Sequence, residues 1–243
     1  MKLRYGLVFV AAALVTIPTA SAASLSIASQ HLTPVRTCVL SGYPSTETIE
    51  PDSYVSQGAA GTNYGTQTYL YAQTGNGANM RPYLSFALPT CTPAIPSTAT
   101  VTSAVLRLYA YTVATTCRTY DVFRVGVGGT TYWPASLTWT AAAIDWTNQP
   151  AGTTINNPPA AEATASENVG TGCTTGIAAA GYASWSVTSD VQAFVNGTDT
   201  NDGWMIRDAT EGNATTYHTY FRSENDNSAT QDPQLVITYV DVP

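Results

Sequence analysis

The chain has 243 residues, of which only 10% are charged, and its nine basic and sixteen acidic side chains give a net charge of -7. It has no run of Lys or Arg, which excludes nucleic-acid binding through a broad basic patch. Thr, Ser, Gly, Asn and Tyr dominate the polar residues, a composition typical of an extracellular β protein.

Residues 1–22 have the three parts of a secretory signal peptide. Lys2 and Arg4 give a positive start, residues 6–17 (GLVFVAAALVTI) are apolar, and residues 20–22 (ASA) are small enough for a signal peptidase. The apolar run is too short for a stable membrane anchor, so we expect a secreted protein without membrane insertion. Without the signal, seven basic residues oppose sixteen acidic ones, a formal charge of -9.

Residues 23–50 show no convincing strand, and we expect an N-terminal extension held to the rest of the chain by Cys38. From residue 51 onward, hydrophobic alternation dominates, and Gly- and Asn-rich stretches read as turns. The predicted strands cover residues 53–57, 68–73, 81–88, 102–113, 119–127, 183–188, 203–208, 216–223 and 233–240.

The stretch TSAVLRLYAYTV (102–113) is the clearest strand. One face carries small and aliphatic residues and is expected in the core; these are Ala104, Leu106, Leu108 and Ala110. The other face carries Val105, Arg107, Tyr109 and Tyr111. We expect the strand over 119–127 to return antiparallel to this one.

A long region from residue 128 to about 181 is rich in Pro, Asn, Ala, Thr and Gly. Stretches of this length without regular structure are often functional. Further on, residues 189–197 (SDVQAFVNG) have helical spacing, with Ser189 as the expected N-cap and Gly197 as the end.

Four cysteines remain in the exported chain, namely Cys38, Cys91, Cys117 and Cys173. An even number in an oxidising compartment indicates two disulfides, and the wide spacing with only two histidines argues against zinc. Three pairings are open. We favour Cys38 with Cys91 and Cys117 with Cys173, because Cys91 and Cys117 would lie at opposite ends of the strand at 101–113; Cys173 would then hold the long region.

Together these elements predict an all-β protein: a two-sheet antiparallel β-sandwich, jelly-roll-like, with one short helix and a long Ala/Thr/Pro-rich loop. No motif is duplicated, so we expect a single domain over residues 51–243.

Several motifs, in this order along the chain, resemble the DNRLRE-type domains, also called carbohydrate-binding module family 96. They are DSYVSQGAAGTNYGTQTYL (52–70), RPYLSFALP (81–89), VTSAVLRLYAY (101–111), LTW (137–139), TNQP (147–150), SWSVTSDVQAFVNG with NDGWMI (184–206), and FRSEN with PQLVITY (221–239). The resemblance implies an exported β-sandwich, often associated with polysaccharide-degrading proteins, some of which bind alginate-like or other acidic glycans. It transfers no binding residue to this chain.

The sequence departs from the family pattern where TAAAIDW (140–146) separates LTW from TNQP, and PAS (134–136) replaces an acidic residue. Trp133 and Trp146 border this departure and are expected to be more exposed than the other tryptophans. Those lie in core-like motifs and are Trp139, Trp185 and Trp204.

The stretch TTYHTYFRSEN (215–225) offers candidate functional residues. On a strand, His218, Tyr220 and Arg222 share one face, and the resemblance implies that Phe221 packs inward on the other. If the protein were a polysaccharide lyase, Arg222 would neutralise a uronate, His218 would abstract a proton and Tyr220 would protonate the leaving oxygen. The scarcity of histidines, only His31 and His218, disfavours catalysis, so no catalytic residue is assigned.

The same face is better suited to binding sugar, since aromatic rings and arginines contact pyranose rings, hydroxyls and carboxylates. The predicted carbohydrate-binding residues are His218, Tyr220, Arg222, Arg107, Tyr109 and Tyr111, provided that their two strands share a sheet. The alternative is that these are ordinary solvent-facing strand residues with high β propensity.

A structural calcium ion is an open possibility, with NDG (201–203) or ENDN (224–227) as oxygen donors, although such residues are more often simply turn formers. The sequence thus favours a secreted, non-catalytic polysaccharide-binding protein, with acidic cell-wall or matrix glycans among the candidate partners. The alternatives are an extracellular structural scaffold and a small lyase.

Overall fold

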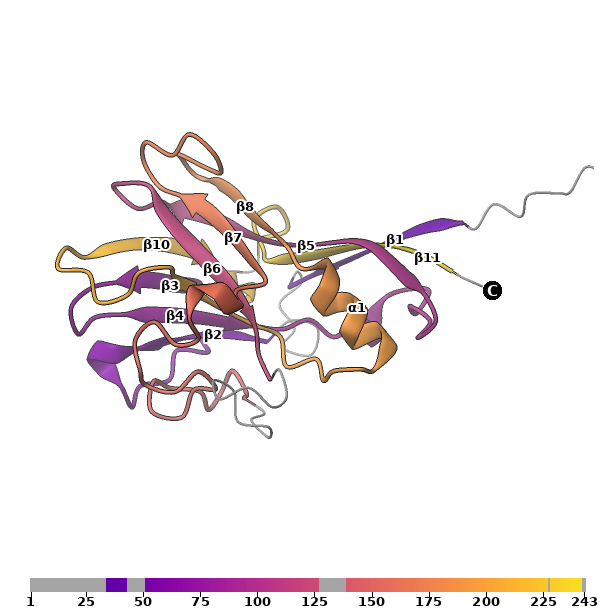
Figure 1. Ribbon diagram of the computed structural model, residues 1–243, viewed down its shortest axis with the longest axis horizontal. Coiled ribbons are helices and arrows are strands. Elements are labelled where there is room, and N and C mark those ends of the chain that lie inside the picture. Colours follow the sequence, from indigo (N-terminus) through magenta and orange to yellow (C-terminus); the bar gives the residue numbers. More distant parts are fainter. Residues whose placement is uncertain (1–33, 43–50, 127–138, 227, 242–243) are drawn as a thin grey trace, which may run out of the picture. The chain divides into compact units, whose positions relative to one another are not determined.

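The computed structural model describes residues 34–42, 51–126, 139–226 and 228–241 (Figure 1). These residues form eleven strands, one α-helix and four short 3-10 turns. The strands are β1 (Val35–Ser41), β2 (Asp52–Ser56), β3 (Tyr69–Thr74), β4 (Met80–Leu84), β5 (Thr100–Thr112), β6 (Arg118–Arg124), β7 (Ala165–Val169), β8 (Gly181–Ser186), β9 (Trp204–Asp208), β10 (Tyr217–Arg222) and β11 (Gln234–Val240), and the helix is α1 (Thr188–Asn196).

All pairs of named strands are antiparallel, in the order β1-β11-β5-β10-β3-β4-β9-β6-β7, with β2 added on β4 and β8 on β5. The hairpin strands β3 and β4 share only one paired position, Gln73 with Met80. The paired strands bend into two layers where β3 meets β4, and side chains of both layers share one core. We call them the β5 layer (β1, β11, β5, β8, β10, β3) and the β4 layer (β2, β4, β9, β6, β7). The fold is therefore all-β and sandwich-like.

The long strand β5 organises its layer. Its one edge pairs first with β11 and then with β10, which follow each other along it, and its other edge pairs with β8. Alternation decides which side chains are buried: Leu106 and Leu108 of β5 are fully buried, and so is Phe221 of β10. They pack in one core cluster with Trp204 and Val122 of the β4 layer.

The outer face of the β4 layer is covered by the segment that follows residue 139. Val55, Tyr83, Phe123 and Met205 face outward from this layer and form a second buried cluster with loop residues, among them Trp146. The expectation that Trp146 is exposed is therefore wrong, since it is only 3% exposed. The position of Trp133 lies outside the described residues.

A buried arginine fixes this covering loop. Arg81 of β4 donates to both carboxylate oxygens of Glu211 at 2.7 Å, and its Nη atoms also donate to loop oxygens. Its Cζ lies 4.5 Å from the ring centroid of Trp146. A buried charge is stable only when paired and hydrogen-bonded, and this guanidinium meets both conditions.

Three local expectations are corrected. Residues before 50 do contain a strand, because β1 pairs with β11 along its whole length. Strand β6 does not return beside β5 but pairs with β7 and β9, and β7 itself lies inside the region expected to be irregular. Helix α1 begins after Val187, so Ser189 is not its cap, whereas Gly197 does end it with a left-handed φ of 68°.

The disulfides join Cys38 to Cys91 and Cys117 to Cys173, which confirms the favoured pairing. The first ties the edge strand β1 to the turn before β5. The second ties the start of β6 to the segment before β8. Among the described residues, the one α-helix is too short and too polar to cross a membrane.

Candidate functional site

Strand β10 presents its side chains as the alternation predicts. Thr219 and Phe221 are fully buried, whereas His218, Tyr220 and Arg222 are half-buried on the opposite face. Strand β10 pairs with β5 on one edge and with β3 on the other. The condition set by the sequence, that β5 and β10 share a sheet, is therefore met.

Tyrosines from three neighbouring strands form a stack on this face. Tyr220 lies opposite Tyr71 of β3, and their rings are parallel within 19° with centroids 4.1 Å apart. On the other side of Tyr220 the ring of Tyr111 of β5 is tilted by 33° at 5.7 Å. The guanidinium carbon of Arg222 lies 4.3 Å from the Tyr111 centroid and ends the stack. We call Tyr71, Tyr220, Tyr111 and Arg222 the aromatic column.

Further rings surround the column edge-on. Tyr69 meets Tyr220 at 5.3 Å with an interplanar angle of 81°, and His218 lies 5.5 Å from Tyr71 and 5.4 Å from Tyr220. Edge-to-face and offset contacts of this kind are the preferred geometries of aromatic pairs. Beyond Tyr69, the buried ring of Tyr54 stacks on Tyr64 at 4.3 Å.

A second aromatic group continues the face toward β8. The guanidinium carbon of Arg107 lies 4.4 Å from the ring centroid of Tyr182, and Tyr109 meets the same ring edge-on at 5.3 Å. The Tyr182 hydroxyl lies within hydrogen-bond distance of the carbonyls of Thr230 and Asp232. Four adjacent strands, β8, β5, β10 and β3, therefore carry half-buried tyrosines on one side; we call this side the tyrosine face.

The two arginines of the face differ in charge pairing. Arg222 forms an ion pair with Asp226 at 2.9 Å and donates to Gln231 at 3.1 Å. Arg107 donates to the neutral side chain of Gln234 at 3.1 Å and, among the described residues, forms no ion pair. The uncompensated charge on the face is therefore that of Arg107.

Partial burial sets the protonation of the face. Burial lowers the pKa of His218 below its usual value, so this imidazole is neutral at neutral pH. Burial likewise raises the pKa of Tyr71 and of Tyr111, which keeps both hydroxyls protonated. Each can then both donate and accept a hydrogen bond.

The stacking decides what the column can offer a ligand. Tyr71 and Tyr111 occupy the two faces of the central Tyr220 ring, so Tyr220 presents its edge and hydroxyl rather than a flat surface. Ring edges carry partial positive charge, and phenol hydroxyls suit ligands with many hydroxyl or carboxylate oxygens. A lyase needs an arginine to neutralise a uronate, and Arg222 is already paired with Asp226.

The described residues of the two candidate calcium segments are engaged in contacts within the fold. Asn201 donates to the carbonyl of Phe86 at 2.8 Å, the carbonyl of Asp202 accepts from Trp139, and Gly203 has a φ of 74°. In the other segment Asp226 is the partner of Arg222. In the part of the chain that the structure describes, no group of three or more His, Cys, Asp or Glu is arranged to hold a metal.

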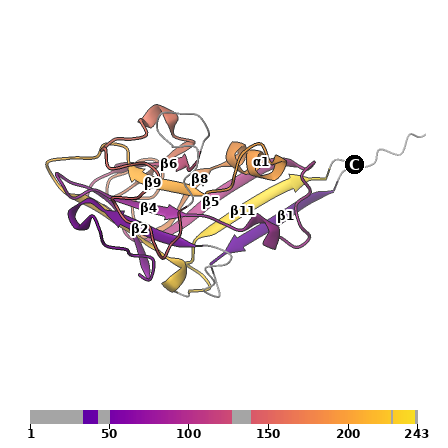
Figure 2. The same ribbon diagram turned by 90° about the horizontal axis from the view of Figure 1, so that it is seen from below.

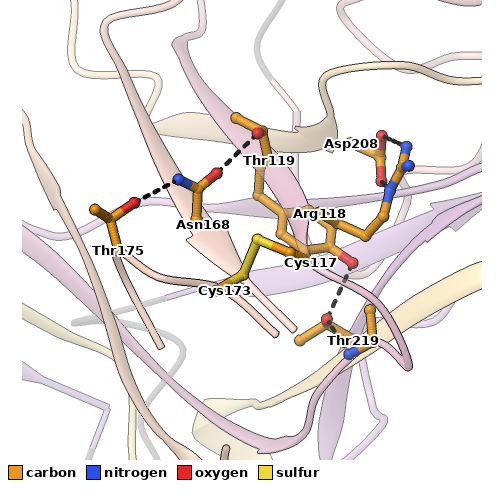
Figure 3. Close-up of a disulfide and its surroundings, with 10 residues drawn as sticks. Cys117, Arg118, Thr119, Asn168, Cys173, Thr175, Asp208 and Thr219 are labelled. Carbon is orange, nitrogen blue, oxygen red and sulfur yellow. Dashed lines mark hydrogen bonds and ion pairs between the residues drawn. A yellow bond between two sulfur atoms is a disulfide. The ribbon is translucent and has the colours of Figure 1, made fainter. Parts of the chain in front are cut away.

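The Cys117–Cys173 disulfide ties the start of β6 to the segment that precedes β8. Figure 3 shows this disulfide and its surroundings. Beside it, Arg118 donates to both carboxylate oxygens of Asp208, and Asn168 links Thr119 to Thr175 through two hydrogen bonds. The disulfide and the Asn168–Thr175 hydrogen bond hold the segment that precedes Tyr182, which lies at one end of the tyrosine face, while the Arg118–Asp208 pair joins β6 to β9.

Comparison with known families agrees with this architecture. The model of carbohydrate-binding module family 96 matches residues 43–239. The chain belongs to this family. No match was found among curated proteins. Family 96 membership implies a carbohydrate-binding function, and the match includes every strand of the tyrosine face.

In this family 96 module, the sequence pointed to six residues of the face and missed three tyrosines of the same surface. All six predicted residues, from β5 and β10, lie on one side of the β5 layer. The missed ones are Tyr69, Tyr71 and Tyr182. Tyr69 and Tyr71 alternate with the buried Leu70 and Ala72, a signal that could have placed them outward. Their approach to Tyr220 depends on strand pairing, which no local pattern contains.

Proposed function

We propose that this family 96 module is a secreted, non-catalytic protein that binds polysaccharide across its tyrosine face. The observation that carries the proposal is the set of half-buried tyrosines on four adjacent strands, with two arginines among them. Adjacent strands are about 4.8 Å apart, so the four strands extend over roughly 14 Å. An extended glycan chain could contact several of these side chains at once.

The ligand we favour is an acidic cell-wall or matrix glycan. Such a chain supplies hydroxyls for the tyrosine hydroxyls and carboxylates for arginine. Arg107 is the better carboxylate partner of the two arginines, because Arg222 already binds Asp226. The negative net charge of the chain opposes binding to polyanions at long range, so the contact must be local.

Secretion is supported by the family and by two disulfides, which persist in oxidising compartments. The predicted signal peptide over residues 1–22 lies outside the described residues. Cleavage is tested by determining the N-terminal sequence of the protein recovered from the culture medium, which should begin at Ala23.

The binding proposal is tested by retention of the exported chain on alginate, pectin, chitin, cellulose and chondroitin-type matrices. The same supernatants are read for the absorbance of unsaturated sugars, the product of a lyase. We expect retention on at least one acidic matrix without new absorbance. Tyr220→Ala and Arg107→Ala should weaken retention. Thr238→Ala should not, because Thr238 of β11 lies on the same side of the β5 layer as Arg107 but away from the tyrosines.

Two results would oppose the proposal in different ways. Retention nowhere would favour an extracellular scaffold whose tyrosines only stabilise the sheet. New absorbance that disappears in His218→Ala would identify the lyase instead.

A further inference from the structure

Strand β1 is an exposed sheet edge with an unusual surface. Among the described residues it pairs only with β11, and it lies at the margin of the β5 layer (Figure 2). Val35 is 68% exposed and Val39 is 57% exposed. These are two of the three large hydrophobic residues that are exposed in the described structure; the third is Ile155, in the covering loop of the other layer.

The exposed valines belong to a wider uncharged surface. Val39 lies opposite Val236 of β11, which lies opposite Val105 of β5, so three valines cross three strands in one row. The next outward-facing row contains Thr37, Thr238 and Ser103. Five of the six side chains in these two rows are β-branched and none is charged, so the rows offer no charge to repel another protein.

Strand β1 itself has few of the features that protect sheet edges, although Pro34 directly precedes it. Edge strands usually avoid pairing with other chains through lysines, prolines or bulges. The seven residues VRTCVLS include no Lys or Pro, and the β1–β11 register runs without a bulge. The single charge, on Arg36, is paired with Asp241 at 3.0 Å. Within the described part of the chain, no second strand pairs with residues 35–40 of β1, and their outward backbone groups can pair with another strand.

We propose that two copies of this chain associate through antiparallel pairing of β1 with β1, centred on Thr37. A two-fold axis makes such an edge self-complementary, because each residue meets its counterpart twice. In this register Val35 of one copy lies opposite Val39 of the other, so both exposed valines are covered. The two nearest alternatives, centred on Arg36 and on Cys38, would place Val35 opposite Thr37 or Ser41 and leave the valines mismatched.

Pairing in this way has a geometric consequence. The two-fold axis of an antiparallel pair is perpendicular to the sheet, so the outer faces of the two β5 layers lie on the same side. If the proposed function holds, the dimer presents two tyrosine faces to one polysaccharide, and linked sites gain avidity. The dimer itself does not depend on glycan binding.

The register is tested by sedimentation velocity over a dilution series of the full exported chain. We expect a dimer for the wild type and a monomer for Val35→Glu and for Val39→Lys, because each change places two charges against valines. The double variant V35E/V39K should dimerise again, since each introduced carboxylate would face an introduced ammonium. Ile155→Lys is the matched control and should remain a dimer.

Three results would overturn the proposal: a monomeric wild type at every concentration, a dimer unaffected by either single change, or no recovery in the double variant. Circular dichroism of each variant shows whether the sandwich is intact. Retention on the matrices used above is measured separately. A monomer that is still retained would reject the dimer alone, and a dimer that is not retained would reject glycan binding alone.

Discussion

Tyr220 is the central residue of the aromatic column, with one tyrosine ring on each side and two further rings edge-on. Such pairs contribute about 0.5–1.5 kcal/mol each beyond the burial of their area. The stack can therefore be a purely structural feature, and binding must be separated from it. Removing only the hydroxyl achieves this separation.

We predict that Tyr220→Phe preserves the fold but weakens glycan retention by about 3- to 10-fold, the range expected for one lost hydrogen bond. The phenylalanine ring can keep both stacking contacts, so the unfolding midpoint should change little. Affinity electrophoresis of wild type, Tyr220→Phe and Tyr220→Ala gives the comparison. Equal retention of wild type and Tyr220→Phe, with loss only in Tyr220→Ala, would mean that the ring and not the hydroxyl binds.

Arg81 is buried and stabilises the fold, in contrast to the partly exposed arginines of the tyrosine face, which we propose for ligand binding. Its guanidinium and the Glu211 carboxylate are fully buried and joined by two hydrogen bonds of 2.7 Å. Glu211 also accepts a hydrogen bond from the backbone of Asn156 in the covering loop. The pair therefore connects β4, the loop and the segment after β9.

Breaking this pair should be costly because it leaves a buried charge without its partner. We predict that Glu211→Gln lowers the free energy of unfolding by about 3–5 kcal/mol, measured by urea denaturation. The matched change Asp226→Asn, in the partly exposed pair with Arg222, should cost no more than about 1 kcal/mol. Similar losses of unfolding free energy in both variants would show that the buried pair stabilises the fold no more than the partly exposed pair.

At the scale of elements, the two disulfides close chain segments of nearly equal length, with separations of 53 and 56 residues. Chain-entropy arguments then give them similar contributions to stability, about 2–4 kcal/mol each. Their positions differ, since Cys117–Cys173 secures the approach to Tyr182 and Cys38–Cys91 secures the edge strand β1. Stability and binding should therefore respond differently.

Replacing either pair by serines should lower the unfolding midpoint by a comparable amount. We predict that, in the monomeric Val35→Glu background where avidity plays no part, only Cys117→Ser/Cys173→Ser weakens retention on the glycan matrix, because only this pair supports the tyrosine face. Retention is compared at a temperature at which both variants are folded by circular dichroism. Weaker retention in Cys38→Ser/Cys91→Ser alone would reverse this assignment.

The strands that could be predicted from the sequence are those with one buried and one open face. In β5 every second residue from Ala104 to Ala110 is fully buried, and the alternation is visible in the residue types. In β1 the apolar residues lie on both faces, because Cys38 and Leu40 are buried while Val35 and Val39 are exposed. The sequence of such a strand does not alternate between apolar and polar residues, so it does not predict a strand.

Pairing and layer assignment were harder to predict than the strands themselves. A hairpin is the simplest expectation for two consecutive strands, yet β6 crosses to the other layer and pairs with β7 and β9. Strand β7 has one fully buried apolar residue, Val169, and exists because β6 provides a partner. The aromatic column is a product of the same long-range pairing, which explains why only part of it could be predicted.

At the scale of the whole molecule, buried carboxyls make stability depend on pH. Asp52 is fully buried and accepts hydrogen bonds from the Ser223 hydroxyl at 2.8 Å and the Glu224 amide at 2.9 Å. Burial nevertheless dominates and raises the pKa of Asp52 to about 8. Burial also raises the pKa of Asp232, in the segment between β10 and β11, to about 6.

An unfolded aspartate ionises near pH 4, so between about pH 4 and 8 the folded chain holds a proton on Asp52 that the unfolded chain has lost. When the native state binds more protons, the free energy of unfolding falls as pH rises. We therefore predict that stability decreases from about pH 5 to pH 8, by a few kcal/mol at most for Asp52. Urea unfolding across this range measures the slope.

The variant Asp52→Asn should flatten this slope even though it lowers stability overall, because an amide cannot accept both hydrogen bonds. Asp145→Asn is the matched control: hydrogen bonding to Thr147 lowers the pKa of this exposed carboxyl, so its contribution is lost only as pH falls below about 4. Its slope between pH 5 and 8 should equal that of the wild type. If Asp52→Asn kept the wild-type slope, Asp52 would be ionised in the folded chain, and its two hydrogen bonds would outweigh its burial.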